Sequence, residues 1–216
     1  MDTITYNRKA AAQYALRWAY LYNPEWPNHT GNSHHHGDCT NFVSQCLHAG
    51  GWRMDGSTSW LGKQGWYVDG NGASHAWAGA QPFANYLKSS GRARRCTRAE
   101  LDVGDVISLL VKGSVFHNVI VSRVDWTKER LKRSLTSLFQ DSGINGIAAC
   151  RADIGLVPTN KVMFISAHDI NRSNYELTDW ENAQVTKQKG TSLLYWKISD
   201  TSAPPAARSC SLWPSR

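Results

Sequence analysis

The sequence predicts an α+β protein with a helical N-terminal part and an antiparallel β-sheet in its second half. Apolar residues recur at helical spacing in the first ninety positions, and short β-branched or aromatic runs follow residue 105. The chain has 216 residues, of which 41% are hydrophobic and 11% aromatic, enough for one substantial core. We therefore expect a single domain over residues 1–200.

Three segments are predicted to be helical. The first covers about residues 7–22 and ends at Asn23-Pro24. The second begins after Asp38, a candidate N-cap, and ends at Gly50-Gly51. Its apolar positions follow an i, i+3, i+4, i+7, i+8 pattern, which buries one face: Cys39, Phe42, Val43, Cys46 and Leu47. The third covers Pro82 to Lys88, and residues 56–79 between them predict an irregular surface segment.

The second half predicts strands at four runs: residues 105–111, 117–124, 162–167 and 193–198. Between the second and third runs, residues 128–139 are basic with leucines at helical spacing, so we expect an amphipathic helix inside a possible insertion over residues 128–160. The basic residues there fit a solvated face better than a polyanion site. Residues 201–216 are rich in Ser, Pro and Ala and predict a flexible tail.

The net charge and the cysteine content indicate which partners and which compartment suit this protein. The formal net charge of +7 favours approach to anionic surfaces such as cell-wall polymers, nucleic acid or acidic lipid headgroups, without indicating specific nucleic-acid recognition. Five cysteines cannot all pair within one chain, so at least one free thiol is expected. No segment reads as an export signal or a membrane span, which indicates a cytoplasmic protein as written, or a secreted or wall-associated one if the N-terminus is truncated.

Cys39 is the candidate nucleophile because it opens a predicted helix. Unpaired N–H groups and the helix dipole favour a thiolate at that position. Cys46 lies two turns further on the same face, where burial keeps a thiol protonated and unreactive.

The nucleophile needs a base, and histidine suits proton transfer near neutral pH. His117 begins a predicted apolar strand and His168 closes the next one, so both are presented by rigid elements. The alternative for both is a half-exposed residue satisfied by water. The run His34-His35-His36 could be a polar surface or a weak metal site, but its residues are too close in sequence to surround one ion well, so we predict no metal and no cofactor.

Several segments together resemble the putative amidase domain family within the papain-like cell-wall hydrolase superfamily. The resemblance touches most of residues 6 to about 180, in order: YNRKAAAQYALRWA, DCTNFVSQCLHAGGW, GWYVDG, LDVGDVI, HNVIV and SAHDINRSN. It implies a papain-like fold, in which N-terminal helices carry the nucleophile and an antiparallel sheet carries the base.

Carried over to this chain, the resemblance implies Cys39 as nucleophile, His117 as general base and His168 as third catalytic member, with Asp169 competing for the third role. We further expect substrate-binding roles for Asp38, Asn41 and Trp77. About fifty residues separate His117 from His168, a longer connection than the family pattern predicts, which is consistent with an insertion over residues 128–160.

The leading hypothesis is a cysteine amidase or peptidase that cuts amide bonds, plausibly in peptidoglycan peptides. A second hypothesis is acyl transfer to or from lipid by the same cysteine and histidine. A third is a non-catalytic module that binds glycan or peptide by stacking on a surface rich in tryptophan, formed by Trp60, Trp66 and Trp77. The sequence does not fix the oligomeric state.

Overall fold

A computed structural model describes residues 4–30, 37–56, 65–70, 72–129, 157–168, 172–187 and 190–202. The chain divides into two compact units, one formed by Met1–Arg123 with Met163–Arg216 and the other by Val124–Val162. The elements of the first unit carry the candidate site. Of the helices described, none is long and apolar enough to cross a membrane.

Two helices, α1 (Arg8–Trp18) and α2 (Cys39–Ala49), form the N-terminal part. Asn7 caps α1, because its side-chain oxygen accepts a hydrogen bond from the Ala10 N–H at 3.0 Å. The predicted extension of this helix to Tyr22 is wrong: a turn joins Trp18 to Leu21, and the Leu21 side chain is 61% exposed. The predicted second helix is confirmed, with Gly50 as its C-cap.

The segment between α2 and the next long helix is better ordered than predicted. Its strands β2 (Val68–Asp69) and β3 (Gly72–Ala73) form a short hairpin, and α3 (His75–Ala78) begins after Ser74, which accepts a hydrogen bond from the Trp77 N–H. The helix predicted over 82–88 is confirmed as α4 (Ala80–Ser89).

The main sheet has six strands in the order β4-β9-β5-β6-β7-β8, and every strand pair whose register is known in it is antiparallel. Four strands lie at the predicted runs: β5 (Val106–Val111), β6 (Ser114–Glu129), β7 (Val157–Ala167) and β9 (Thr191–Ile198). The predictions missed β4 (Ala93–Cys96), β8 (Arg172–Glu176) and α6 (Leu177–Lys187). The mixed α+β class with an antiparallel sheet is thus confirmed.

Two boundaries differ from the predictions. Lys128 and Glu129 are the last residues of β6, so the helix predicted from Lys128 does not start there; the rest of that segment lies outside the described residues. The predicted tail begins with a short strand, β10 (Thr201–Ser202), which pairs with β1 (Ile4–Thr5). A 3₁₀ turn at Arg98–Glu100 follows β4.

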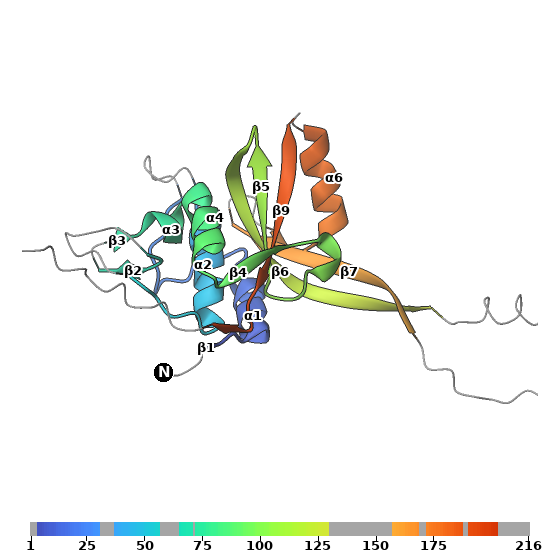
Figure 1. Cartoon of the computed structure of the whole chain (residues 1–216), viewed down its shortest axis with the longest axis horizontal. Helices are drawn as coiled ribbons and strands as arrows, with labels where there is room; N and C mark the ends of the chain where they lie inside the picture. The colour runs from blue at the N-terminus through green and yellow to red at the C-terminus, as the bar shows by residue number, and fades with distance from the viewer. Residues whose placement is uncertain are drawn as a thin grey trace, which may run out of the picture. The chain divides into compact units, whose positions relative to one another are not determined.

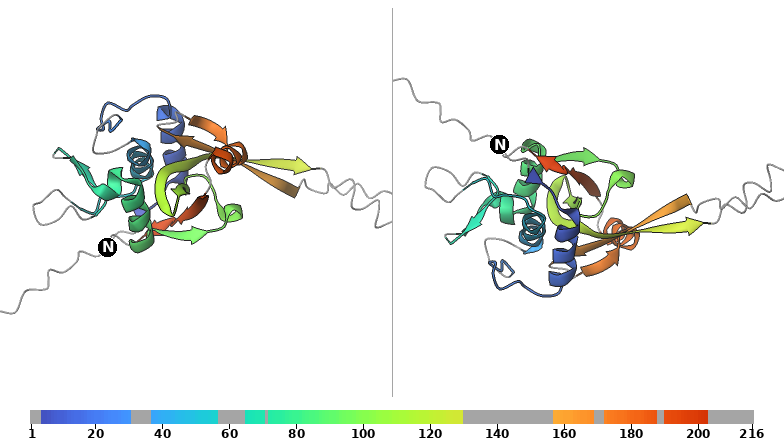
Figure 2. Two further views of the ribbon diagram at one scale, coloured as in Figure 1. Left: turned by 90° about the horizontal axis from the view of Figure 1, so that it is seen from above. Right: turned by 90° about the horizontal axis from the view of Figure 1, so that it is seen from below.

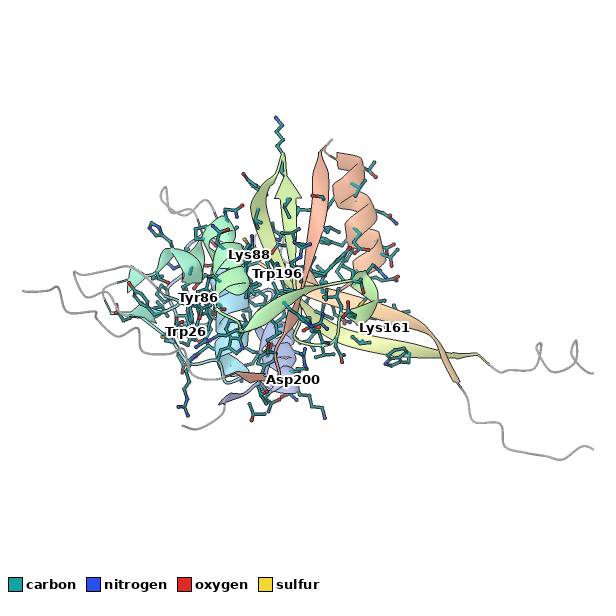
Figure 3. The ribbon with its side chains drawn as sticks, viewed as in Figure 1. Trp26, Tyr86, Lys88, Lys161, Trp196 and Asp200 are labelled. Atoms are coloured by element: carbon teal, nitrogen blue, oxygen red, sulfur yellow. The ribbon has the colours of Figure 1, made fainter. Side chains whose placement is uncertain are left out.

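Helices cover both faces of this sheet. Figure 1 shows α2, α3 and α4 gathered on one side and α6 on the other, and the views in Figure 2 agree. The core between α1, α2, α4 and the sheet contains large aromatic side chains, among them the fully buried Trp66 and Trp77. Trp196 of β9 belongs to the same core and lies near the centre of the molecule in Figure 3.

Asp105 joins the start of α1 to the sheet. Its buried carboxylate lies 2.6 Å from the Arg8 Nη1, 2.9 Å from the Lys197 Nζ and 2.9 Å from the backbone N–H of Ile198. Arg8 also donates to the carbonyl of Val103 at 3.0 Å. A carboxylate satisfied by this many donors compensates the cost of burying its charge.

We predict that Asp105→Ala lowers the free energy of unfolding by about 3 kcal/mol, because it removes the carboxylate that pairs with Arg8 and Lys197 and leaves the buried Ile198 N–H without its acceptor. Urea unfolding measures the change. The control is Lys88→Ala, an exposed lysine of α4 labelled in Figure 3, whose replacement should change stability by less than about 0.5 kcal/mol. Equal effects in both variants would contradict this role of Asp105.

Candidate active site

Cys39 is the first residue of α2, and its side chain is 6% exposed. The helix starts here because the apolar face that follows, including Phe42, Val43 and Leu47, is fully buried against the core. The Cys39 sulfur lies 3.6 Å from the hydroxyl oxygen of Thr40. The thiol therefore lies at the helix end where unpaired backbone N–H groups favour negative charge.

Asp38 occupies the N-cap position but does not cap the helix with its side chain, contrary to the prediction. Its Oδ1 instead accepts hydrogen bonds from the backbone N–H of His29 at 2.9 Å and from the Asn41 side chain at 2.8 Å. Its Oδ2 lies 2.6 Å from the Nδ1 of His168. This buried carboxylate thus joins the preceding loop, α2 and the end of β7 directly before the thiol.

His168 follows the last residue of β7 and is 2% exposed. Its Nε2 lies 2.8 Å from the carbonyl oxygen of Trp18, and its ring stacks on Phe42 with centroids 4.1 Å apart. A carbonyl oxygen can only accept, so Nε2 carries a proton. Nδ1 and the Asp38 carboxylate are within hydrogen-bond distance of each other.

Both ring nitrogens of His168 are engaged, Nδ1 by Asp38 and Nε2 by the Trp18 carbonyl. Its role as third catalytic member stays a prediction. The two partners lie 130 and 150 positions earlier in the chain, where local sequence patterns do not indicate them. Asp169, the competing residue, lies outside the described residues.

Asn118 of β6 connects the start of α2 to the sheet. Its side-chain amide donates to the Thr40 hydroxyl at 3.0 Å, and its carbonyl oxygen accepts from the Ser108 hydroxyl at 2.6 Å. Ser108, on β5, in turn accepts from the indole N–H of Trp196 at 3.0 Å. A buried, fully paired chain of this kind fixes the position of the first turn of α2 relative to three strands.

His117 lies immediately before Asn118 and is 6% exposed. It is the fourth residue of β6, not the first as predicted, and pairs with Leu109 of β5. The next residue pair joins Leu110 to Val115, so a β-bulge leaves Phe116 without a partner in that ladder and 70% exposed. The hydrogen bond between Asn118 and Thr40 therefore joins the strand that carries His117 to the first turn of α2.

Asp38, Asn41 and Trp77, the expected substrate contacts, are fully buried. Their substrate-binding role stays a prediction. The Trp77 indole donates to the Asn41 side chain at 2.7 Å, and the Asn41 amide donates to the Pro27 carbonyl at 2.7 Å. These hydrogen bonds join the first turn of α2 to α3 and to the loop before α2.

Two of the tryptophans predicted to form a surface for glycan or peptide stacking are buried. Trp66 and Trp77 lie in the core with ring centroids 4.6 Å apart, and Ser44 links them by accepting from the Trp66 indole and donating to the Trp77 carbonyl. Both are fully buried, so neither belongs to an exposed patch. Trp60 lies outside the described residues.

The other described cysteines differ from Cys39 in their surroundings. Cys46 is fully buried, and burial raises its pKa well above the ordinary value of a thiol. Cys96 is partly exposed; burial, followed by the charges of Asp105 and Glu100, raises its pKa as well. All three described cysteines are free thiols, which confirms that free thiols are present. Cys150, Cys210 and the run His34 to His36 lie outside the described residues.

Thr40 and Asn118 were absent from the predicted site. Asn118 carried a usable signal, because it is the one polar residue in the apolar run HNVIV after the histidine. A buried polar side chain inside a strand needs a partner, and the partner here is the helix start.

The fold and this site define a mixed α+β protein in which a thiol at a helix start and a histidine in a strand are carried by neighbouring backbones. A family model described as "Putative amidase domain" matches residues 5–142, and the chain belongs to this family. That range contains Cys39 and His117 and ends before His168. The family membership supports amide hydrolysis at the level of the family.

A relative in Bacillus subtilis (strain 168), "Uncharacterized protein YhbB", is 38% identical over 106 residues. The match covers 47% of this chain and 32% of the relative, so the chain spans about a third of that protein's length. No solved structure matches the chain.

We predict that Asp38 and His168 are energetically coupled. In a double-mutant cycle with Asp38→Ala and His168→Ala, the coupling energy should be about 1–3 kcal/mol, because each single variant leaves the other group buried without its partner. Urea unfolding of the four proteins measures it. The exposed ion pair of Arg94 and Glu100 is the matched control and should give a much smaller coupling. Additive effects of Asp38→Ala and His168→Ala on the free energy of unfolding would contradict the predicted coupling.

Proposed function

We propose that this protein is a cysteine-dependent hydrolase of amide bonds, with Cys39 as nucleophile and His117 as general base. The observation that carries the proposal is the hydrogen bond between Thr40 and Asn118, which joins the residues that directly follow the proposed pair. Membership of the amidase family supports the bond class. We further propose that the elements are arranged as in papain-like enzymes, with the thiol on a helix and the base on an antiparallel sheet.

In the proposed reaction, the His117 ring takes the Cys39 proton as the sulfur attacks the carbonyl carbon of the amide. The backbone N–H of Cys39 donates to the oxygen that becomes negative, a contribution of a few kcal/mol when well aimed. The C–N bond then breaks, and His117 returns its proton to the leaving amine. Water, deprotonated by His117, hydrolyses the thioester and releases the carboxylic acid and the free thiol.

The proposed role of His168 follows from its contacts. It acts through Asp38 as a positioning residue, because it holds the carboxylate that precedes the nucleophile and packs on Phe42 of the same helix. The third member of the catalytic group is left unassigned by this proposal.

Peptides of the bacterial cell wall are the proposed substrates. The formal charge of +7 favours approach to an anionic wall polymer. Acyl transfer to or from lipid by the same pair is the second candidate. The non-catalytic module has lost its support among the described residues, since Trp66 and Trp77 are buried.

The proposed domain extent is residues 1–200 as one amidase domain, with residues 128–160 inserted. The division of the chain supports this, because Val124–Val162 form a compact unit separate from the residues before and after.

We predict that iodoacetamide at neutral pH alkylates Cys39 at least tenfold faster than Cys96, as measured by peptide mapping with mass spectrometry. Exposure alone predicts the reverse order, because Cys96 is the more exposed of the two. The helix start and the histidine favour the Cys39 thiolate, whereas burial and carboxylates disfavour the Cys96 thiolate. Faster alkylation of Cys96, or equal rates, would refute the activated thiol.

We predict that Cys39→Ala abolishes cleavage of purified wall peptides and that His117→Ala lowers its rate at least a hundredfold. Cys96→Ala is the matched control and should keep the parent's rate. The same four proteins are assayed against acyl-lipids by mass spectrometry. Cleavage of the lipids alone would move the proposal to the second candidate, and unchanged peptide cleavage by Cys39→Ala would exclude the thiol mechanism.

A further inference from the structure

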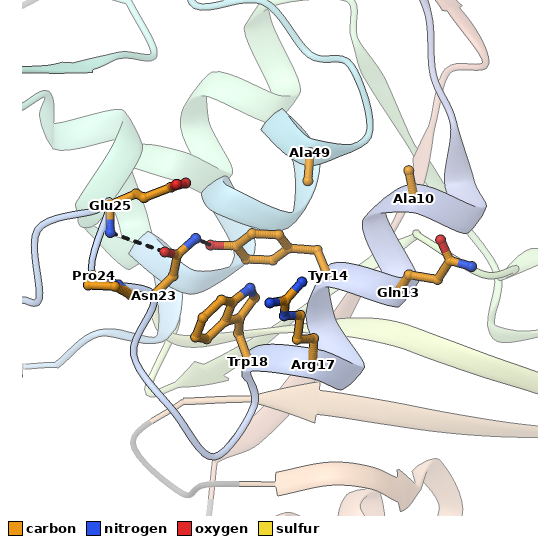
Figure 4. Close-up of a pocket in the computed structure, with 9 residues that line it drawn as sticks. All are labelled: Ala10, Gln13, Tyr14, Arg17, Trp18, Asn23, Pro24, Glu25 and Ala49. Atoms are coloured by element: carbon orange, nitrogen blue, oxygen red, sulfur yellow. Dashed lines mark hydrogen bonds between the residues drawn. The ribbon is translucent and has the colours of Figure 1, made fainter.

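A pocket of about 550 Å³ opens beside α1, away from the thiol. Figure 4 shows its walls, which come from α1, from the loop after α1 and from the end of α2: Ala10, Gln13, Tyr14, Arg17, Trp18, Asn23, Pro24, Glu25 and Ala49. Ala49 lies ten residues after Cys39 on α2, which is about 15 Å along the helix axis. The volume falls in the range typical of small-molecule sites, and none of the proposed catalytic residues lines it.

Two aromatic rings form one wall of the pocket. Tyr14 and Trp18 have centroids 6.3 Å apart with their planes tilted by 44°. Two hydrogen bonds hold the Tyr14 hydroxyl: it donates to the Gln45 side chain at 2.8 Å and accepts from the Asn23 side chain at 3.0 Å. The rings are therefore fixed in place and present their carbon surfaces to the pocket.

Polar groups of three kinds surround these rings. Arg17 is a donor, Glu25 is an acceptor, and Gln13 is both. In the described part of the chain, the side chains of Gln13 and Glu25 form no hydrogen bond or ion pair, and the Arg17 guanidinium stacks on the Trp18 indole, 5.0 Å from the ring centroid. Stacking on the indole orients the guanidinium before any ligand arrives.

Exposed apolar side chains are frequent in the segment that runs from the second half of α1 to the pocket residue Asn23. Four of the seven large hydrophobic side chains exposed in the described residues lie within positions 16–22: Leu16, Tyr20, Leu21 and Tyr22. Tyrosine and tryptophan combine an apolar body with a polar tip, which suits contacts with ligands that are apolar on one face and polar at the edge.

From these features we propose that the pocket binds a neutral oligosaccharide. A sugar ring has a carbon face that packs on aromatic rings and hydroxyls at its edge that both donate and accept. Arg17 and Glu25 have opposite charge, so a ligand with a single net charge would meet a like charge as well as an opposite one. An extended peptide fits less well, since the walls are helix and loop side chains with no strand edge for main-chain pairing.

This binding does not depend on the proposed hydrolysis. If both hold, the pocket would retain the glycan of a wall polymer while Cys39 cuts its peptide, and that combined role rests on the proposed function.

Isothermal titration calorimetry with the β-1,4-linked tetramer of N-acetylglucosamine tests the proposal on the full chain. The parent and Cys39→Ala should bind with equal affinity, which separates this site from the catalytic proposal. Gln13→Ala and Glu25→Ala should each weaken binding about three- to tenfold, since each removes hydrogen bonds to the ligand. Both side chains are exposed, so circular dichroism should find these variants folded.

Trp126→Leu is the matched control, an exposed tryptophan on β6 outside the pocket, and should bind as the parent does. The dipeptide alanyl-alanine, which carries both charges, is the competing probe. Binding of the dipeptide without the tetramer, no heat from the tetramer at millimolar concentration, or unchanged affinity in both pocket variants would overturn the proposal.

Discussion

The hydrogen bond between Thr40 and Asn118 joins the two halves of this fold where its chemistry would take place. Thr40 belongs to the first turn of α2. Asn118 belongs to β6, a central strand that lies between β5 and β7 in the sheet. Both side chains are fully buried, so each would cost free energy if left without a partner. Ser108 and Trp196 complete the chain of partners on β5 and β9. This contact therefore fixes the helix start that carries Cys39 against the strand that carries His117.

A second buried contact fixes the helix start from the other direction. His168 spans from the carbonyl of Trp18 to the carboxylate of Asp38, and it thereby joins the end of β7, the end of α1 and the residue before the thiol. Burying His168 and Asp38 costs desolvation free energy, which their close hydrogen-bond geometry offsets. The pair contributes to the specific placement of these segments as well as to stability. The pocket beside α1 shares this support, since Trp18 contributes its indole to the pocket and its carbonyl to His168.

The parts of the fold that sequence reasoning predicted are those with strong local periodicity. The second helix repeats apolar residues at helical spacing, and the four predicted strands are apolar runs. The missed elements lack that signal: β4 reads ARRC at the sheet edge, β8 reads RSNYE, and α6 buries little beyond Leu177 and Trp180. Within the site, Cys39 and His117 could be proposed from local position, but the partners of His168 are more than a hundred residues away. The glycines and serines around Trp66 and Trp77 predict a surface segment, and only tertiary packing buries these two tryptophans.

The pairing of Cys39 with His117 is the central claim, and the pH dependence of Cys39 alkylation tests it most directly. The rate of iodoacetamide reaction at Cys39 is measured between pH 4 and pH 10 in the parent, in His117→Ala and in the control His48→Ala, which lies at the other end of α2. If His117 stabilises the thiolate, the midpoint of the rate profile moves to higher pH in His117→Ala and stays unchanged in His48→Ala. Identical profiles in the parent and His117→Ala would contradict the pairing.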